Sequence, residues 1–158
     1  MGSIYLKGSA AGFTTIRVFP KEQILDERGC VHHMLRNDDK EFEAFGEIYF
    51  SEIYPGQVKA WHFHKRMELN YLVIRGRIRL LATTADPSDK DVFIDEIFLG
   101  PENHVLVKVP ACCWNGFECI GNEPALIANC ASIPYDPNEI QRFGPDAFDK
   151  DLWFNRAR

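Results

Sequence analysis

The sequence lacks several features that would place the chain in a specialised class. No hydrophobic run approaches the ~20 residues that a membrane-spanning helix needs, and the N-terminus has no charged-then-apolar signal pattern. Excess positive charge is also missing, because the formal net charge is −5. Without a basic face, a chain cannot supply the counterion release on which general nucleic-acid binding depends. We therefore expect neither a membrane nor a nucleic acid as partner.

Paired cysteines are missing as well. The five cysteines are odd in number and irregular in spacing, and none forms a CxxC pair. A disulfide framework or a zinc knuckle would need regular pairs. We expect free thiols and a cytoplasmic location, where the environment is reducing.

Helical patterns are scarce, whereas short strand-like runs separated by turn residues fill the chain. Strands are expected at 15–19, 47–54, 69–74, 77–81, 91–99, 104–109 and 125–132. Only residues 146–154 are expected to form a short helix, because Phe148 and Leu152 are four apart. The sequence predicts one all-β domain over residues 1–158, with a barrel core at about 16–145 and a short C-terminal helix.

Two finer features follow from the same patterns. Arg75-Gly76 lies between two strand-like runs and predicts a hairpin turn. Arg77 and Arg79 alternate with apolar residues, so we expect both arginines on a solvated face or at a dimer interface.

The stretch WHFH (61–64) contains the main candidates for functional residues. Residues two apart on a strand share a face, so His62 and His64 should point together while Trp61 and Phe63 point into packing. Glu68 keeps the same parity, provided that no bulge intervenes. Two imidazoles with a carboxylate can hold a divalent metal. Alternatively, an imidazole with a pKa near neutrality can remove or deliver a proton.

The spacing of this stretch resembles the first motif of the cupin superfamily. The run from Gly56 through both histidines to Gly76 nearly reproduces that motif. The second cupin motif ends in a metal-binding histidine, whose place is taken by Asn115. An amide oxygen is a poor ligand for such metals, so a metal site would lose one of its four ligands. We expect Asn115 to contact the substrate. The resemblance implies a jelly-roll β-barrel.

Over residues 16 to about 145, the chain more closely resembles the dTDP-4-dehydrorhamnose 3,5-epimerase branch of the cupins. Five ordered elements carry this resemblance: DERG (26–29), FGEIYFSEIYPGQVKAWHFH (45–64), LVIRGRI (72–78), LVKVPACCWNGF (106–117) and IPYDPNE (133–139). The resemblance implies an epimerase or isomerase of carbohydrate biosynthesis. Such an enzyme acts on a nucleotide-activated keto-deoxysugar by removing a proton α to the carbonyl.

The resemblance also implies roles for individual residues. His62 falls on the family's catalytic base. Arg28 falls on an arginine that contacts the nucleotide sugar, and Lys59 falls on an arginine that contacts phosphate. Glu47 and Tyr49 fall on polar positions that line the sugar site.

Two catalytic residues of that branch are absent. Its enolate-stabilising lysine aligns with Leu69, and its general-acid tyrosine aligns with Ala128. The related 3,4-ketoisomerases of dTDP-4-keto-6-deoxyglucose carry a His-x-His-Lys sequence, which HFHK (62–65) resembles. Both histidines work in those enzymes. We therefore expect His62 and His64 to serve as base and proton donor, in either order.

The resemblance further implies a homodimer with no resident cofactor. Two alternatives remain open. A metal-dependent cupin enzyme would use His62, His64 and Glu68, whereas a non-catalytic sugar-nucleotide-binding protein would explain the two absent catalytic residues. Tyr71 and Tyr135 are further candidates to reach the site.

Overall fold

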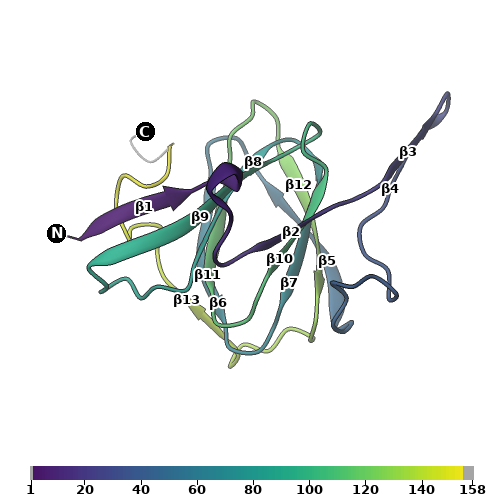
Figure 1. Ribbon diagram of the computed structural model, residues 1–158. Helices are drawn as coiled ribbons and strands as arrows, with labels where there is room; N and C mark the ends of the chain where they lie inside the picture. Colours follow the sequence, from purple (N-terminus) through teal and green to yellow (C-terminus); the bar gives the residue numbers. More distant parts are fainter. Residues whose placement is uncertain (1, 155–158) are drawn as a thin grey trace.

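The computed structural model describes residues 2–154, which are built almost entirely from β-strands (Figure 1). The prediction of an all-β chain is confirmed. The elements are β1 (Ser3–Lys7), η1 (a 3-10 turn, Ser9–Ala11), β2 (Arg17–Pro20), β3 (Gln23–Asp26), β4 (Gly29–His32), β5 (Glu47–Ile53), β6 (Val58–His64), β7 (Leu69–Arg75), β8 (Ile78–Thr83), β9 (Asp91–Leu99), β10 (Val105–Val109), β11 (Trp114–Cys119), β12 (Ala125–Ala131) and β13 (Ile140–Arg142).

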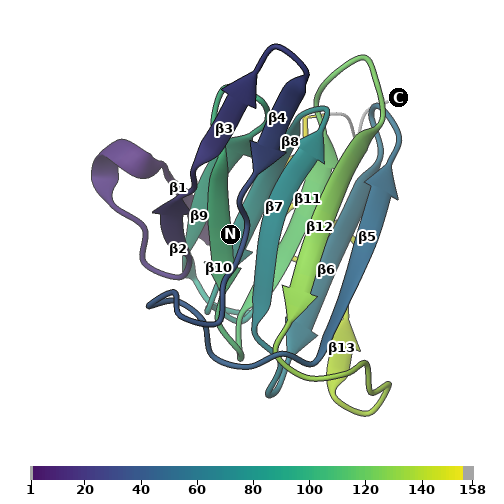
Figure 2. The same cartoon turned by 90° about the vertical axis from the view of Figure 1, so that its right-hand side faces the viewer.

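Two sheets make up the body of the molecule. The six-stranded sheet has the order β1-β9-β8-β11-β6-β13, and the five-stranded sheet has the order β2-β10-β7-β12-β5 (Figure 2). Alternate side chains of both sheets form a shared core that includes Leu80, Val107 and Ile127. Among the described strands, no hydrogen-bonded ladder joins one sheet to the other. The expected closed barrel is therefore wrong in detail, and the architecture is two open sheets with a core between them.

The turn at Arg75-Gly76 does not make a hairpin. β7 pairs with β10 and β12, whereas β8 pairs with β9 and β11, so the chain passes between the sheets at this point. Gly76 has φ +75°, and a Cβ there would come within 2.6 Å of the Ala125 Cα. Only glycine fits this corner, because it tolerates both the left-handed backbone and the close approach of β12.

The C-terminal segment lies over the outer face of the six-stranded sheet. There Trp61, Trp114 and Trp153 form a second hydrophobic cluster, in which the Trp61 and Trp153 ring centroids are 5.2 Å apart. Within residues 146–154 the chain forms turns and bends, so the expected helix is wrong. The segment follows the sheet instead of coiling, because neighbouring Leu152 and Trp153 are both buried against it.

The prediction that Arg79 lies on a solvated face or at a dimer interface is wrong. Arg79 is 1% exposed beneath the C-terminal segment, and it is paired with Glu96 (2.5 Å) and Glu118 (3.0 Å). Its Nη1 also donates to the Leu152 carbonyl at 2.8 Å. The alternation placed Arg79 correctly on the outer face, but it could not reveal the segment that covers this face. Arg77 is exposed, as expected, and pairs with Glu102.

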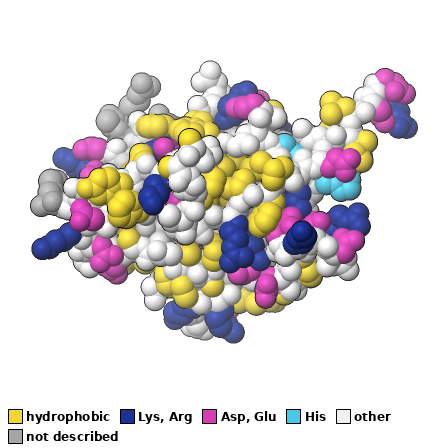
Figure 3. Space-filling model, viewed as in Figure 1, with side chains coloured by type: hydrophobic (Ala, Val, Ile, Leu, Met, Phe, Trp, Pro, Cys, Tyr) yellow, Lys and Arg dark blue, Asp and Glu magenta, His cyan; other side chains and the backbone are white. Residues whose placement is uncertain are grey.

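The β3–β4 hairpin forms a separate two-stranded sheet that projects from the body (Figure 1). Its side chains Ile24, Leu25 and Val31 are 48%, 74% and 57% exposed. Figure 3 shows hydrophobic side chains along this projection and charged side chains at its tip. An isolated two-stranded hairpin is marginally stable by itself.

Candidate active site

A cavity of about 420 Å³ lies between the two sheets, on the side where β5 and β13 form the sheet edges. Its wall from the six-stranded sheet consists of Lys59, His62, His64, Phe117, Ile140 and Arg142. Its wall from the five-stranded sheet consists of Glu47, Tyr49, Ser51 and Tyr71, with Met67 and Tyr135 added from loops. The structure thus brings together seven of the residues singled out in the sequence: His62, His64, Glu47, Tyr49, Lys59, Tyr71 and Tyr135.

His62 and His64 share the cavity-facing side of β6, as the strand pattern predicts. Trp61 and Phe63 face the opposite side, where they join the outer hydrophobic cluster. Strand alternation therefore fixes which side chains enter the cavity.

His62 is held as a neutral imidazole. Burial, together with the positive charges of Arg142, His64 and Lys59, lowers its pKa to about 4. Arg142 lies directly opposite on β13, where it is the strand partner of His62. A neutral imidazole at pH 7 has a free lone pair with which to accept a proton.

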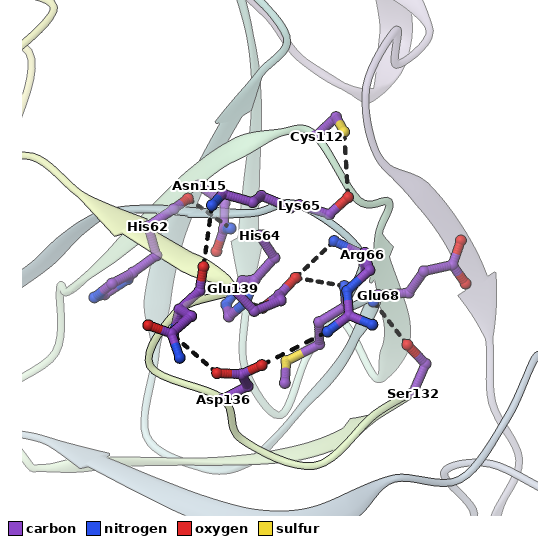
Figure 4. A network of polar contacts seen from close by, with 12 residues as sticks. His62, His64, Lys65, Arg66, Glu68, Cys112, Asn115, Ser132, Asp136 and Glu139 are labelled. Carbon is purple, nitrogen blue, oxygen red and sulfur yellow. Dashed lines mark hydrogen bonds and ion pairs between the residues drawn. The ribbon is translucent and has the colours of Figure 1, made fainter.

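His64 is paired with a buried carboxylate. Its Nδ1 lies 2.8 Å from the Glu139 Oε2, and Glu139 is 3% exposed (Figure 4). The other oxygen of Glu139 accepts the backbone N–H groups of Arg66 (2.6 Å) and Met67 (2.8 Å). Because a carboxylate accepts, Nδ1 carries the proton of His64.

Hydrogen bonds keep the buried Glu139 carboxyl group ionised. Burial by itself would raise the pKa of this carboxyl. The bonds from Arg66, His64 and Met67 outweigh burial and hold the pKa of Glu139 below its usual value. The cavity therefore contains a carboxylate–histidine pair next to the neutral His62.

The alternative metal site does not fit this arrangement. β6 ends at His64, so Glu68 lies in a loop and not on the histidine strand. Its carboxylate pairs with Lys108 at 2.7 Å, and Figure 4 shows it directed away from both histidines. Over residues 2–154, no three His, Cys, Asp or Glu side chains converge in a way that could hold a metal ion.

Lys59 and Arg142 give the cavity its positive charge. Lys59 Nζ crosses to the other sheet and donates to the Ser51 Oγ (2.8 Å) and to the Glu52 carbonyl (2.7 Å). Neither cation has a carboxylate within 4.0 Å among the ion pairs of the described residues. Cations without acidic partners in a concave site favour an anionic ligand.

Asn115 does not line the cavity. It is 1% exposed; its Nδ2 donates to the His62 carbonyl (3.2 Å), and its Oδ1 accepts from the Tyr71 hydroxyl (3.3 Å). Burial raises the pKa of Tyr71 well above its usual value. The expectation that Asn115 contacts the substrate does not fit this burial. Instead, Asn115 and Tyr71 tie the histidine strand to the opposite sheet.

Arg28 lies outside the cavity of its own chain. It occupies the tip of the projecting β3–β4 hairpin and pairs with Asp26 at 2.6 Å. Its side chain is 82% exposed. Its predicted contact with a nucleotide sugar stays a prediction.

The positions aligned with the absent catalytic residues are apolar and face elsewhere. Leu69 is in the core at 1% exposure. Ala128 is the partner of Phe50 on the outer side of the five-stranded sheet. Of the nearby cations, Lys65 donates to the Asn138 carbonyl and Arg66 pairs with Asp136, so neither replaces the absent lysine in the cavity.

Sequence reasoning missed Glu139 and Arg142. Glu139 belongs to the aligned IPYDPNE element, in which only Tyr135 was considered, so a signal was present. Arg142 has no such signal, because β13 is only three residues long and its partner strand lies nearly eighty residues earlier in the chain.

Comparisons with known proteins agree with this geometry. No protein-family model matches the sequence. A probable low-salt glycan biosynthesis epimerase from Haloferax volcanii is 34% identical over 114 residues, which cover 70% of this chain and 73% of the relative. The spore coat polysaccharide biosynthesis protein SpsL from Bacillus subtilis is 26% identical over 131 residues, which cover 82% of this chain and 87% of the relative.

Solved structures lead to the same group. The crystal structure of a dTDP sugar isomerase from Desulfovibrio desulfuricans G20 is 39% identical, with a TM-score of 0.78 over 84% of this chain and 85% of that one. The dTDP-6-deoxy-D-glucose-3,5-epimerase RmlC from Legionella pneumophila shares the fold, with a TM-score of 0.72 at 17% identity over 84% of this chain and 76% of that one. The chain belongs to the sugar epimerase and isomerase family that includes this dTDP sugar isomerase and the Haloferax volcanii glycan biosynthesis epimerase.

Proposed function

We propose that this chain is a nucleotide-sugar epimerase or isomerase of carbohydrate biosynthesis, which removes a proton α to the carbonyl of a keto-deoxysugar. One observation carries the proposal: the neutral imidazole of His62 faces a cavity that also presents two cations with no acidic partner among residues 2–154. The volume of about 420 Å³ is within the usual range for small-ligand sites. The relatives named for glycan and polysaccharide biosynthesis support the pathway class.

In the proposed reaction, His62 takes the α proton. The electron pair of the broken C–H bond forms the C=C bond of an enolate, whose charge comes to lie on the former ketone oxygen. The positive charge of Arg142, the strand partner of His62, is in place before the reaction and stabilises this developing charge. His64, held by Glu139, is the group on the same wall that can exchange protons with His62 or with the sugar.

Lys59 and, from a second copy of the chain, Arg28 are the proposed diphosphate contacts. Binding the diphosphate there would offset the charge of Lys59, which is one of the charges that now lower the pKa of His62. The pKa of His62 should then rise, so substrate binding itself would make His62 a stronger base.

The proposal extends to assembly and location. We propose a homodimer, because the apolar side chains of the β3–β4 hairpin need a covering surface and only a second copy would bring Arg28 near a cavity. All five cysteines are free, which fits the proposed cytoplasmic location. No helix within residues 2–154 has the length and hydrophobicity to span a membrane. The reaction as proposed uses side chains alone and needs no metal.

Incubation of the purified protein with dTDP-4-keto-6-deoxyglucose tests the proposal. We expect a new dTDP-sugar by NMR, at a rate that EDTA leaves unchanged. The His62→Asn variant, which keeps a similar shape, should lose activity by roughly 10²–10⁴-fold. Loss of turnover in EDTA would instead favour a metal-dependent enzyme. Tight binding in a thermal-shift panel of nucleotide sugars, with no turnover of any of them, would favour a non-catalytic binding protein.

A further inference from the structure

The two walls of the cavity differ in the stereochemistry that they permit. His62 and His64 both project from β6, so they approach a bound sugar from the same wall. Protons that are removed and returned on one face leave the configuration of a carbon unchanged. Inversion of a carbon needs a proton donor on the opposite wall.

The opposite wall has few groups that can donate a proton. Glu47 is a carboxylate, and a carboxylate accepts. The Ser51 hydroxyl oxygen accepts from the Lys59 ammonium, and an alcohol is a much weaker acid than a phenol. The Tyr71 hydroxyl is buried and already donates to Asn115. Tyr49 remains.

Tyr49 is held by Asn129 in a way that leaves its proton free. Asn129 Oδ1 accepts the backbone N–H of Asn70 at 2.9 Å, and that N–H can only donate. The orientation of the amide is therefore fixed, and its Nδ2 donates to the Tyr49 hydroxyl oxygen at 2.8 Å. Within the described part of the chain, no acceptor binds the Tyr49 hydroxyl proton. That proton is left for a ligand.

The row of side chains around Tyr49 makes this arrangement rigid. Tyr49, Asn129 and Tyr71 are direct neighbours on β5, β12 and β7, on the face of the sheet that turns toward the cavity. Asn129 is fully buried. Burial, against the opposing effect of the Asn129 bond and with a contribution from Glu47, raises the pKa of Tyr49. The phenol thus stays protonated at neutral pH.

We infer that Tyr49 is the catalytic acid of the wall opposite His62, and that the enzyme inverts a sugar carbon. The inference rests on the proposed function. Of the two reactions included there, epimerisation and isomerisation, it selects epimerisation. His62 removes the proton on one face and leaves an enolate. The Tyr49 O–H bond then breaks as its proton forms a C–H bond on the other face of the same carbon. The tyrosinate regains a proton from water, and the protonated His62 releases one to water.

The Tyr49→Phe variant separates the two half-reactions. In D₂O with dTDP-4-keto-6-deoxyglucose, it should still exchange the α hydrogen through His62. It should form the inverted product roughly 10²–10⁴-fold more slowly than the unaltered enzyme. Tyr54→Phe is the matched control, because Tyr54 follows the end of β5, is 63% exposed and does not line the cavity. This control should exchange and invert at the rates of the unaltered enzyme.

Each other outcome has a distinct meaning. An unaltered enzyme that neither exchanges nor converts the sugar would refute the proposed function itself. An unaltered enzyme that moves the ketone without inverting any carbon would leave the proposed function standing and overturn the role of Tyr49. The same holds if Tyr49→Phe inverts the sugar at the unaltered rate. Loss of both exchange and inversion, in a variant with an unchanged melting temperature, would overturn the division of roles between the two walls.

Discussion

At the residue scale, the pKa of His62 depends on its burial and on the cations that neighbouring strands place beside it. Burial is the largest cause of its lowered pKa, and Arg142 is the first of the charges that add to it. Because Arg142 and His62 are strand partners, the effect is built into the pairing of β13 with β6.

The Arg142→Gln variant should therefore have a higher His62 pKa. Removing one cation makes the imidazolium less unfavourable, so the acid limb of kcat/KM should move upward from about pH 4 in the unaltered enzyme. The pKa should stay below the usual histidine value, because burial persists. NMR titration of the imidazole signals measures it. Arg36→Gln is the control, since that arginine is exposed and pairs with Asp38. An equal shift in both variants would contradict a local effect of Arg142.

The Glu139→Gln variant tests the buried carboxylate. The carboxylate serves His64 with one oxygen and two backbone N–H groups with the other, which a single amide oxygen cannot do. We expect a loss of about 1–3 kcal/mol in the free energy of unfolding at pH 7, measured by urea titration.

The pH dependence of that loss has a defined sign. The pKa of Glu139 is lower in the folded protein than its ordinary value of 4.5. Its contribution is therefore complete above about pH 4.5 and is lost as the pH falls below it. The difference between the unaltered protein and Glu139→Gln should shrink in acid. A difference that grows in acid would contradict the account.

The direction of a side chain could be predicted from the sequence where it depends only on the alternation within one strand. Alternation alone places His62 and His64 together and Trp61 opposite them. It fails for Asn115 and Glu68, whose surroundings depend on the bulge between β11 and β6 and on the point where β6 ends. Neither feature leaves a local signal in the sequence.

At the scale of elements, most strands follow from their own residues, whereas their pairing does not. The expected strand at 91–99 has the bounds of β9, and that at 125–132 nearly matches β12. A glycine between two strands predicts a turn equally well whether the chain forms a hairpin or crosses to another sheet. Gly76 does the second, because long-range pairing with β12 and β11 decides the outcome.

The C-terminal segment should be held by Arg79 as well as by its tryptophans. Arg79→Leu would leave the fully buried Glu118 without its cation, at a cost of roughly 3–5 kcal/mol in the free energy of unfolding. The double variant Arg79→Leu/Glu118→Leu should recover part of that loss, because no uncompensated charge remains. Urea denaturation of both variants measures the coupling. A double variant no more stable than the single one would contradict a charge-based origin.

At the scale of the whole molecule, the projecting β3–β4 hairpin predicts a dimer. Size-exclusion chromatography with light scattering should give twice the mass of one chain. Leu25→Asp and Val31→Asp place charges on the exposed apolar side chains of the hairpin and should shift the mass toward the monomer. Leu6→Asp, at an exposed apolar position on the distant edge strand β1, should not. A monomeric unaltered protein would refute the assembly, and with it any contact of Arg28 with a cavity.

The proposed reaction begins when His62 removes the α proton of a nucleotide-linked keto-deoxysugar. The most direct measurement is deuterium incorporation from D₂O into dTDP-4-keto-6-deoxyglucose, followed by mass spectrometry against a blank without enzyme. We expect rapid incorporation next to the ketone with the unaltered enzyme and a rate roughly 10²–10⁴-fold lower with His62→Asn. Incorporation at the unaltered rate in the His62→Asn variant would contradict this role of His62.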